Sequence, residues 1–321
     1  MWVTSSTELI QTPTAVALGK FDGVHRGHQR VIQPILHKPV DAERIYPTVI
    51  TFFPHPQEFF TGKPRKLLTP LDEKVQQLEL LGVEQLVLIP FNKELSALTP
   101  EQFVEQIIVE KLQASRISVG QDFCFGSNRS GTAFDLQILV AKYGIPVNIV
   151  PLETHEDDLP LKLEETRIST SLIRQILEAG DIEKANLLLG RPYTLMGTVV
   201  KGQQLGRTIG FPTANLQLPE DKFLPQQGVY AVRVSAINTP DTSLKNHWGV
   251  MNIGKRPTVN GTLPTVEVHL LDWSGDLYDK QLKIQLEKFL RPEQKFSSLE
   301  ALKSQIQLDC TIARKFFSIG C

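Results

Sequence analysis

The segment GKFDGVHRGHQ, from Gly19 to Gln29, constrains the fold of the first half of the chain more than any other. The apolar run over residues 15–18 before it predicts a short buried strand, and the apolar residues after it have the spacing of a helix. In an open α/β sheet, a glycine-rich loop between a strand and a helix lies at the edge where ligands bind. We expect the helix to begin near His28, with its N-terminal N–H groups facing the same space.

Two histidines of this loop are candidates for chemistry. His25 and His28 are three residues apart, which places both rings on one side of a helical turn. Gly19, Gly23 and Gly27 allow the backbone to approach a bulky anion closely. No third ligand stands at zinc spacing, and the glycines match neither a Walker A loop nor a GxGxxG fingerprint. Taken alone, the pair is also compatible with surface or structural histidines.

As a whole string, GKFDGVHRGHQ resembles the HxGH signature of nucleotidylyltransferases, in the form carried by prokaryotic FAD synthetases. The resemblance implies catalytic roles for His25 and His28. It also implies that the loop binds nucleotide through Gly19, Phe21, Asp22, Gly23 and Gly27. Lys20 stands where that family frequently has Asn.

The chain up to residue 150 alternates predicted strands with predicted helices. This alternation favours an α/β fold with a mainly parallel, doubly wound sheet and right-handed crossovers. The predicted strands cover residues 15–18, 48–53, 85–89, 117–119 and 145–150. The loops at 19–28, 52–57 and 120–131 each follow a strand, so we expect them to converge on one edge and form one site.

Two of these loops are candidates for contacts with the flavin. Pro54, His55 and Pro56 are expected to hold an extended backbone and to exclude a helix, although a rigid strand exit explains them equally well. The loop GQDFCFGSNRSG carries aromatic residues without helical partners. From the convergence of the loops, the Pro-His-Pro segment, Asp122 and Phe123 are predicted to border the flavin.

The segment EETRISTSLIRQILEAG predicts a capped amphipathic helix, with Ser169 or Thr170 as its N-cap and Gly180 at its end. It resembles the ISSTxIR motif of the same adenylyltransferase family. The resemblance implies that the Ser/Thr pair binds phosphate and that Arg174 acts in catalysis. At Leu172 the family often has Arg, so Arg174 is expected to carry more of that role.

Near Gly190 the apolar periodicity changes from helical to alternating, which predicts a domain over residues 1–187 and another over 188–321. The second is expected to be a small antiparallel β-barrel with a terminal helix that begins at Ser297. Its predicted strands cover residues 193–200, 229–237, 248–253, 266–271 and 282–289.

The segment GQQLGRTIGFPTANL lies between the first two of these strands. The Thr213 hydroxyl and the Asn215 carbonyl, two residues apart on an extended turn, can point at one hard cation. Nearby glycines let backbone N–H groups approach phosphates, although a glycine-bearing hairpin is the simpler alternative. The candidate nucleotide-binding residues here are Gly202, Gly206, Arg207, Gly210 and Phe211.

The string GRPYTLMGTVVKGQQLGRTIGFPTANL resembles the riboflavin kinase module, as do GVYAV, GVMNIGKRPTV, VEVHLLD and FLRPEQKF. The resemblance implies Mg²⁺ at Thr213 and Asn215, with Glu267 as catalytic base. The alternation of the strand points Glu267 and His269 away from the core, which permits that role. Arg291 is expected to clamp the flavin or the phosphates.

Together the resemblances cover nearly the whole chain and imply a bifunctional riboflavin kinase/FMN adenylyltransferase. ATP is then the co-substrate, and riboflavin, FMN and FAD are the other small-molecule partners. Two alternatives are a different HxGH nucleotidyltransferase and a flavin carrier without turnover. Retention of both histidines, Glu267 and the Thr213/Asn215 pair argues against the carrier, because binding alone needs none of them.

The composition sets the broad class. The net charge of −1 gives no polybasic field for nucleic acid or anionic membrane. The first residues lack a signal-peptide pattern, and no run is long and apolar enough to span a bilayer. Three scattered cysteines favour reduced thiols, so we expect a cytoplasmic enzyme. An oligomer is compatible with the sequence, which does not define its state.

Overall fold

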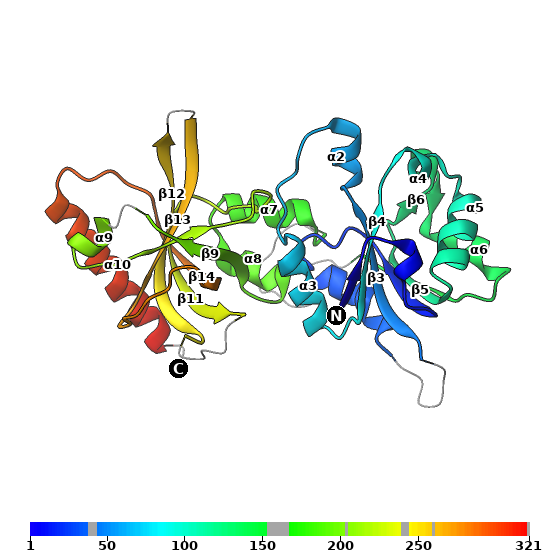
Figure 1. Cartoon of the computed structure of the whole chain (residues 1–321), viewed down its shortest axis with the longest axis horizontal. Helices are drawn as coiled ribbons and strands as arrows, with labels where there is room; N and C mark the ends of the chain where they lie inside the picture. Colours follow the sequence, from blue (N-terminus) through cyan, green and yellow to red (C-terminus); the bar gives the residue numbers. More distant parts are fainter. Residues whose placement is uncertain (38–43, 153–166, 203–204, 239–243, 259–260, 320–321) are drawn as a thin grey trace. The chain divides into compact units, whose positions relative to one another are not determined.

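A computed structural model of the chain is shown in Figure 1. It describes residues 1–37, 44–152, 167–202, 205–238, 244–258 and 261–319. Backbone contacts divide the chain into two units, Met1–Thr170 and Ser171–Cys321, and each is described by itself.

The first unit is built on a six-stranded sheet with strand order β1-β4-β3-β2-β5-β8, in which every neighbouring pair is parallel. Its strands are β1 (Trp2–Thr4), β2 (Thr14–Leu18), β3 (Tyr46–Phe53), β4 (Gln85–Pro90), β5 (Ala114–Gly120) and β8 (Val147–Val150), with a small separate pair β6 (Cys124–Phe125) and β7 (Gly131–Thr132). Its helices are η1 (Thr7–Leu9), α1 (Arg26–Ile32), η2 (Gln33–Ile35), α2 (Pro56–Thr61), α3 (Leu71–Leu80), α4 (Lys93–Ala97), α5 (Pro100–Phe103), the π-helical η3 (Val104–Lys111), η4 (Ser127–Arg129) and α6 (Ala133–Ala141).

The predicted doubly wound parallel sheet is confirmed. All five residues of β2 are buried, and alternate residues belong to different apolar clusters. Val16 and Leu18 pack with α5, η3 and α6 on one side, whereas Ala15 and Ala17 pack with α1, η2 and α3 on the other. Both faces of the sheet are therefore covered, as βα crossovers require.

One local prediction in this unit is wrong. Pro56 does not exclude a helix but is the first residue of α2, whose N-cap is His55. The first N–H of a helix has no intrahelical partner, so a proline at that position removes nothing that the helix uses. Pro54 still lies in non-helical backbone before the cap.

The second unit contains a closed antiparallel barrel with strand order β10-β13-β12-β11-β14-β9, which confirms the predicted barrel. Its strands are β9 (Tyr193–Val200), β10 (Ala214–Gln217), β11 (Gly228–Ile237), β12 (His247–Thr258), β13 (Gly261–Leu270) and β14 (Gln281–Pro292). Its helices are α7 (Thr170–Glu178, beginning at the last residue of the first unit), α8 (Ile182–Leu189), α9 (Leu205–Thr208) and α10 (Leu299–Ile319).

The terminal helix α10 runs along the outside of the barrel (Figure 1). Cys310, Ala313 and Phe317 of the helix pack against the outward-facing side chains of Val229 and Ala231 and their neighbours. These apolar residues therefore form the face of the helix that covers the barrel.

Helix α8 is joined to the barrel strands by Asn186. Its amide nitrogen donates to the carbonyl of Leu286 at 2.8 Å, and its amide oxygen accepts from the Tyr193 N–H at 2.7 Å. These bonds group α8 with the barrel, whereas the periodicity assigned it to the first half. The domain boundary at residues 187–188 stays a prediction.

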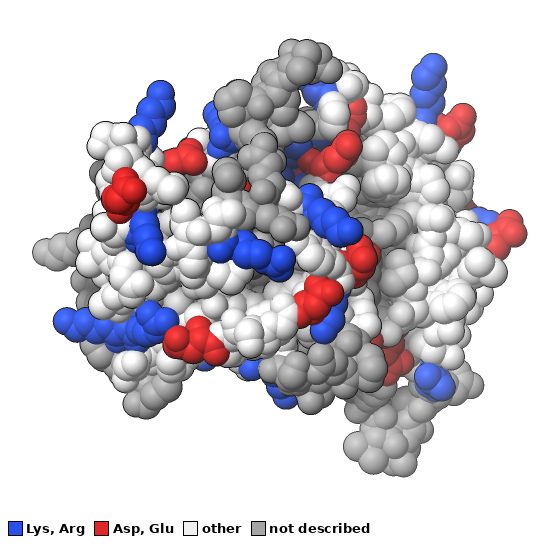
Figure 2. All heavy atoms as spheres, turned by 60° about the vertical axis from the view of Figure 1, so that its left-hand side comes forward, with Lys and Arg blue, Asp and Glu red and all other residues white. Residues whose placement is uncertain are grey.

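On the face that Figure 2 shows, Lys and Arg side chains are interspersed with Asp and Glu side chains among uncharged surface. The presence of both signs of charge on this face agrees with the net charge of −1. Within the described ranges, no helix combines the length and hydropathy needed to cross a bilayer.

Candidate active sites

The loop between β2 and α1 has an unusual backbone. Phe21 and Val24 have positive φ angles of 48° and 42°, although each is only 1% exposed, and Gly23 has a φ of 89°. Non-glycine residues adopt this region at a cost, so the surrounding packing must hold them there. Such held backbone is found preferentially at functional sites.

Asp22 anchors this loop to another part of the unit. Its buried carboxylate accepts hydrogen bonds from the N–H groups of Leu68 (2.8 Å) and Thr69 (3.2 Å), while the Gly23 N–H donates to the Thr69 hydroxyl at 2.9 Å. The Thr170 hydroxyl donates to the Asp22 carbonyl at 3.0 Å. The carboxylate therefore shapes the loop, and its direct contact with nucleotide stays a prediction.

His25 and His28 lie together, as their spacing predicts. Their rings are stacked with centroids 3.6 Å apart, and Phe21 meets the His28 ring edge-on at 5.3 Å. Helix α1 begins at Arg26 rather than near His28, because His25 is its N-cap and accepts the His28 N–H on Nδ1 at 3.3 Å. A methyl group at Gly27 would lie 3.3 Å from the His25 ring, so glycine leaves room for that ring.

His55 is likewise the N-cap of its helix, α2. Its Nδ1 accepts the Gln57 N–H at 3.1 Å, and the Glu58 carboxylate accepts the His55 N–H at 3.0 Å. Burial lowers the pKa of His55 from 6.5 to about 4, and the positive charges of Lys20 and Arg65 contribute. The ring is therefore neutral at physiological pH.

We expect the His55 ring to stay uncharged between pH 5 and 8, with its NMR titration midpoint near pH 4. Because this pKa lies below the unfolded value, the folded state takes up the proton less readily, and stability falls as the pH drops from 6.5 toward 4. The imidazole proton shifts followed from pH 8 to 4 test this. A midpoint near 6.5 would contradict the buried, cation-flanked placement.

Cationic side chains from several loops influence this region. The pKa of Lys20 is lowered by burial and by the charges of Arg129 and Arg65, while Asp122 opposes the shift. Asp122 itself pairs with Arg167 at 2.5 Å. The sequence pattern did not single out Arg65, Arg129 or Arg167. Arg129 lies in the loop at 120–131, and Arg65 follows α2, which begins in the loop at 52–57. Such a group of cations suits the binding of phosphate.

Aromatic side chains lie close to the predicted flavin-binding segments. Phe91 makes edge-on contacts with Phe52, Phe59 and Phe60, and Phe60 is 70% exposed beside the Pro-His-Pro segment. In the loop after β5, the half-buried Phe123 ring stacks on Phe125 with centroids 5.8 Å apart. Pro54 is exposed and Pro56 half-buried. The roles of these residues toward flavin stay predictions.

The predicted phosphate-binding helix is α7. The hydroxyl of its first residue, Thr170, donates to the Asp22 carbonyl in the loop between β2 and α1. Ser169, just before it, is half-buried. Arg174 belongs to the second unit, where its guanidinium carbon lies 4.8 Å from the centre of the Phe223 ring, and Leu172 is half-buried. The catalytic role of Arg174 and the phosphate contacts stay predictions.

In the second unit, the candidate metal ligands and base face one another across two paired strands. Asn215 of β10 pairs with Glu267 of β13, and Glu267 pairs on its other side with Asn252 of β12. The neighbours Val266 and Val268 are buried at 3% and 1% exposure, so Glu267 has the strand phase that the alternation predicts. Sequence reasoning did not single out Asn252, because its proximity to Glu267 depends on strand pairing.

The turn before β10 completes this group. The Thr213 hydroxyl donates to Glu267 Oε2 at 3.3 Å. A methyl group at Gly202 would lie 2.5 to 2.7 Å from the carboxamide carbon and oxygen of Asn215, and one at Gly206 would lie 3.3 Å from the Thr213 hydroxyl. Gly202 therefore leaves the space that the Asn215 side chain occupies, whereas Gly206 leaves room chiefly for the Phe211 carbonyl, to which such a methyl group would lie closest.

The other candidate nucleotide-binding residues of the segment GQQLGRTIGFPTANL differ in backbone conformation and in burial. Gly210 has a φ of 88°, which glycine allows at the end of α9. Arg207 is exposed, whereas Phe211 is 9% exposed and packs with the apolar cluster under α10. Their contacts with nucleotide stay predictions.

The Thr213 hydroxyl and the Asn215 carboxamide oxygen fit a hard cation such as Mg²⁺, with the Glu267 carboxylate beside them. Within the part of the chain that the structure describes, no three His, Cys, Asp or Glu side chains are grouped to hold a metal ion. The candidate metal donors are one hydroxyl and one amide oxygen. They suit a cation that takes further ligands from bound phosphates.

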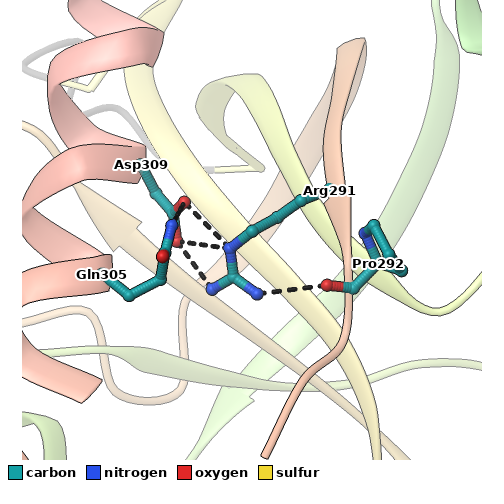
Figure 3. Close-up of polar contacts among 4 residues, drawn as sticks. All are labelled: Arg291, Pro292, Gln305 and Asp309. Carbon is teal, nitrogen blue, oxygen red and sulfur yellow. Dashed lines mark hydrogen bonds and ion pairs between the residues drawn. The ribbon is translucent and has the colours of Figure 1, made fainter. Parts of the chain in front are cut away.

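Arg291 is predicted to clamp the flavin or the phosphates, and this role stays a prediction; in the structure its guanidinium contacts the helix α10 (Figure 3). Its Nε and Nη2 donate to the Asp309 carboxylate at 2.9 and 2.8 Å, and Gln305 donates to the same carboxylate at 2.9 Å. Its Nη1 donates to the Pro292 carbonyl at 3.1 Å. Arg291 therefore fastens the end of β14 to α10.

We expect Asp309→Ala to lower the free energy of unfolding of the second unit by about 3–5 kcal/mol, because it leaves the Arg291 charge without its buried partner. Urea unfolding of the full chain, followed by tryptophan fluorescence, measures this. Asp272→Ala is the matched control, because Asp272 pairs with Arg314 on the surface and such pairs contribute about 0–1 kcal/mol. Equal losses in both variants would contradict the role of the pair.

Comparison with known proteins finds two family matches. The FAD synthetase family matches residues 7–162, and the riboflavin kinase family matches residues 189–317. Bifunctional riboflavin kinase/FMN adenylyltransferases of Haemophilus influenzae and Escherichia coli K12 are each 38% identical, covering 95% and 96% of this chain and 94% of their own lengths. The Bacillus subtilis relative of the same name is 36% identical over 96% of this chain and 94% of its own.

Among solved structures, one described as a macrolide-efflux protein from Streptococcus pneumoniae is similar over 97% of this chain and 98% of its own, with a TM-score of 0.82 and 30% identity. The similarity extends over both units, so the combination of sheet and barrel in one chain recurs in that protein.

Proposed function

The chain belongs to the family of bifunctional riboflavin kinase/FMN adenylyltransferases, and we propose that its two units divide the two reactions between them. It phosphorylates riboflavin to FMN with ATP, and it joins FMN to the AMP part of ATP to give FAD and pyrophosphate. The proposal rests on one observation: each family match coincides with its own group of chemically suited side chains.

In the kinase reaction, the ribityl hydroxyl of riboflavin attacks the γ-phosphorus of ATP, and ADP leaves. We assign the acceptance of the hydroxyl proton to the Glu267 carboxylate. Thr213 and Asn215 would hold Mg²⁺, which when bound neutralises charge on the transferred phosphoryl group. Because Thr213 already donates to Glu267, the same turn orients both the base and the metal ligands. Asn252, beside Glu267 on β12, joins this group in the proposal.

In the adenylyl transfer, a phosphate oxygen of FMN attacks the α-phosphorus of ATP, and pyrophosphate leaves. This nucleophile is already an anion, so no base is needed, and catalysis consists of positioning and charge stabilisation. His25 and His28, stacked at the start of α1, are placed to act on the α-phosphate. We assign phosphate contacts also to Ser169 and Thr170 of the same unit.

The cationic residues near His55 support this assignment, because FMN and the triphosphate of ATP are both polyanions. The positive charges of Arg129 and Arg65 both lower the pKa of Lys20, after the larger effect of burial, so both lie near it. For the flavin ring we propose the exposed Phe60, together with Phe123 and the Pro-His-Pro segment. An aromatic surface of this kind suits a flat ring system.

The two reactions leave different products from ATP, and this separates the proposal from its alternatives. We expect riboflavin to trigger release of ADP, and FMN to trigger release of pyrophosphate, from the purified chain with ATP and MgCl₂. Pyrophosphate released with another phosphorylated compound but not with FMN would favour a different nucleotidyltransferase. Flavin binding without either product would favour a carrier. We further propose that the enzyme is cytoplasmic. Its small-molecule partners are riboflavin, FMN, FAD and ATP.

A further inference from the structure

The register of β10 and β13 places two pairs of polar residues opposite one another. Asn215 pairs with Glu267, and Ala214 pairs with Val268. Continued by one residue, the same register brings Thr213 opposite His269. Because residues two apart share a face of a strand, the metal-ligand pair and the Glu/His pair face each other on the same side of the barrel wall.

His269 contacts this turn directly. Its Nδ1 lies 2.8 Å from the carbonyl oxygen of Pro212, and since a carbonyl only accepts, the ring donates through Nδ1–H. Phe211 meets the ring edge-on at 5.5 Å, which helps to fix its orientation. The Pro212–Thr213 peptide group is thereby held from β13.

Because residue 212 is a proline, the hydrogen bond from His269 is important for holding the backbone there. Pro212 has no N–H, so its carbonyl is the only backbone group through which a hydrogen bond can hold that residue. The next group along the chain, the Thr213 hydroxyl, donates to Glu267 on the same strand β13. His269 and Glu267 thus hold successive parts of one turn.

We propose that His269 is a positioning residue of the kinase site, holding the Pro212–Thr213 peptide so that the Thr213 hydroxyl and the Asn215 carboxamide converge on Mg²⁺. The inference rests on the proposed kinase function. It assigns His269 no contact with substrate. Residues that orient metal ligands in this way typically contribute about 10- to 100-fold to metal affinity or activity.

The test compares three variants of the full chain. His269→Phe keeps a flat ring that fits a strand but removes the donor, and His269→Asn retains a donor near the position of Nδ1. His247→Phe is the matched control, because His247 of β12 also contacts a backbone carbonyl, that of Leu271 at 2.6 Å, away from the Thr213 turn. Binding of Mn²⁺ in the presence of ADP is measured by electron paramagnetic resonance, beside the Mg²⁺ dependence of the kinase rate.

We expect His269→Phe to weaken Mn²⁺ binding by about 10- to 100-fold and to raise the Mg²⁺ concentration for half-maximal kinase rate similarly. His269→Asn should stay within a few-fold of wild type, and His247→Phe should match wild type. Wild-type Mn²⁺ binding in His269→Phe would overturn the proposal, as would equal losses in His269→Phe and His247→Phe or no recovery in His269→Asn. A wild-type chain without kinase activity would instead count against the proposed function.

Discussion

Glu267→Gln is expected to lower the riboflavin kinase rate by about 10² to 10⁴-fold while FMN is still converted to FAD. Glutamine has nearly the same shape but cannot accept the proton of the ribityl hydroxyl. The substitution lies in the barrel, whereas His25 and His28, which we propose for the adenylyl transfer, lie in the other unit. Separate assays that start from riboflavin and from FMN, with flavins resolved by chromatography, measure the two rates.

The matched control for this prediction is Glu287→Gln. Glu287 also lies on a barrel strand, β14, but pairs with Arg233 at 3.0 Å and has no proposed role in catalysis. We expect it to retain kinase activity. A kinase rate of Glu267→Gln within a few-fold of wild type would exclude the carboxylate as general base.

His28→Ala is expected to abolish FAD formation, so that FMN accumulates from riboflavin and ATP. The variant removes a ring that stacks on His25 at the start of α1, where we propose that the α-phosphate of ATP binds. Loss of one such preorganised group typically costs about 10²- to 10³-fold in rate. The barrel retains its own site, so the kinase step should proceed normally.

His37→Ala serves as the control, because His37 is exposed after η2 and has no proposed role. Circular dichroism of both variants shows whether the first unit is folded. An unchanged FAD yield from a folded His28→Ala protein would refute the assignment of the histidine pair.

Much of the fold could be predicted because its central strands are buried on both sides and form continuous apolar runs, as in β2. The edge strand β1 was not predicted, since it has only three residues and two of them are exposed. The strand β10 was read as part of a loop, because its pairing partners lie in β9 and β13. Long-range pairing, which local pattern does not report, decided both cases.

The site could be predicted where its residues lie close in sequence. His25 and His28 are one turn apart, and Thr213 and Asn215 share one face of an extended segment. The partner of Arg291 could not be predicted in this way, because Asp309 lies 18 residues later on another element. The packing of α10 on the barrel brings the two together and uses the guanidinium for structure.

The central claim is that one chain carries two ATP-dependent sites that act in succession on a single flavin. A time course of the purified wild-type chain with riboflavin, ATP and MgCl₂, with flavins separated by chromatography, tests it most directly. We predict that FMN appears first and then declines as FAD rises. Formation of only one of these products, at any enzyme concentration, would contradict the claim.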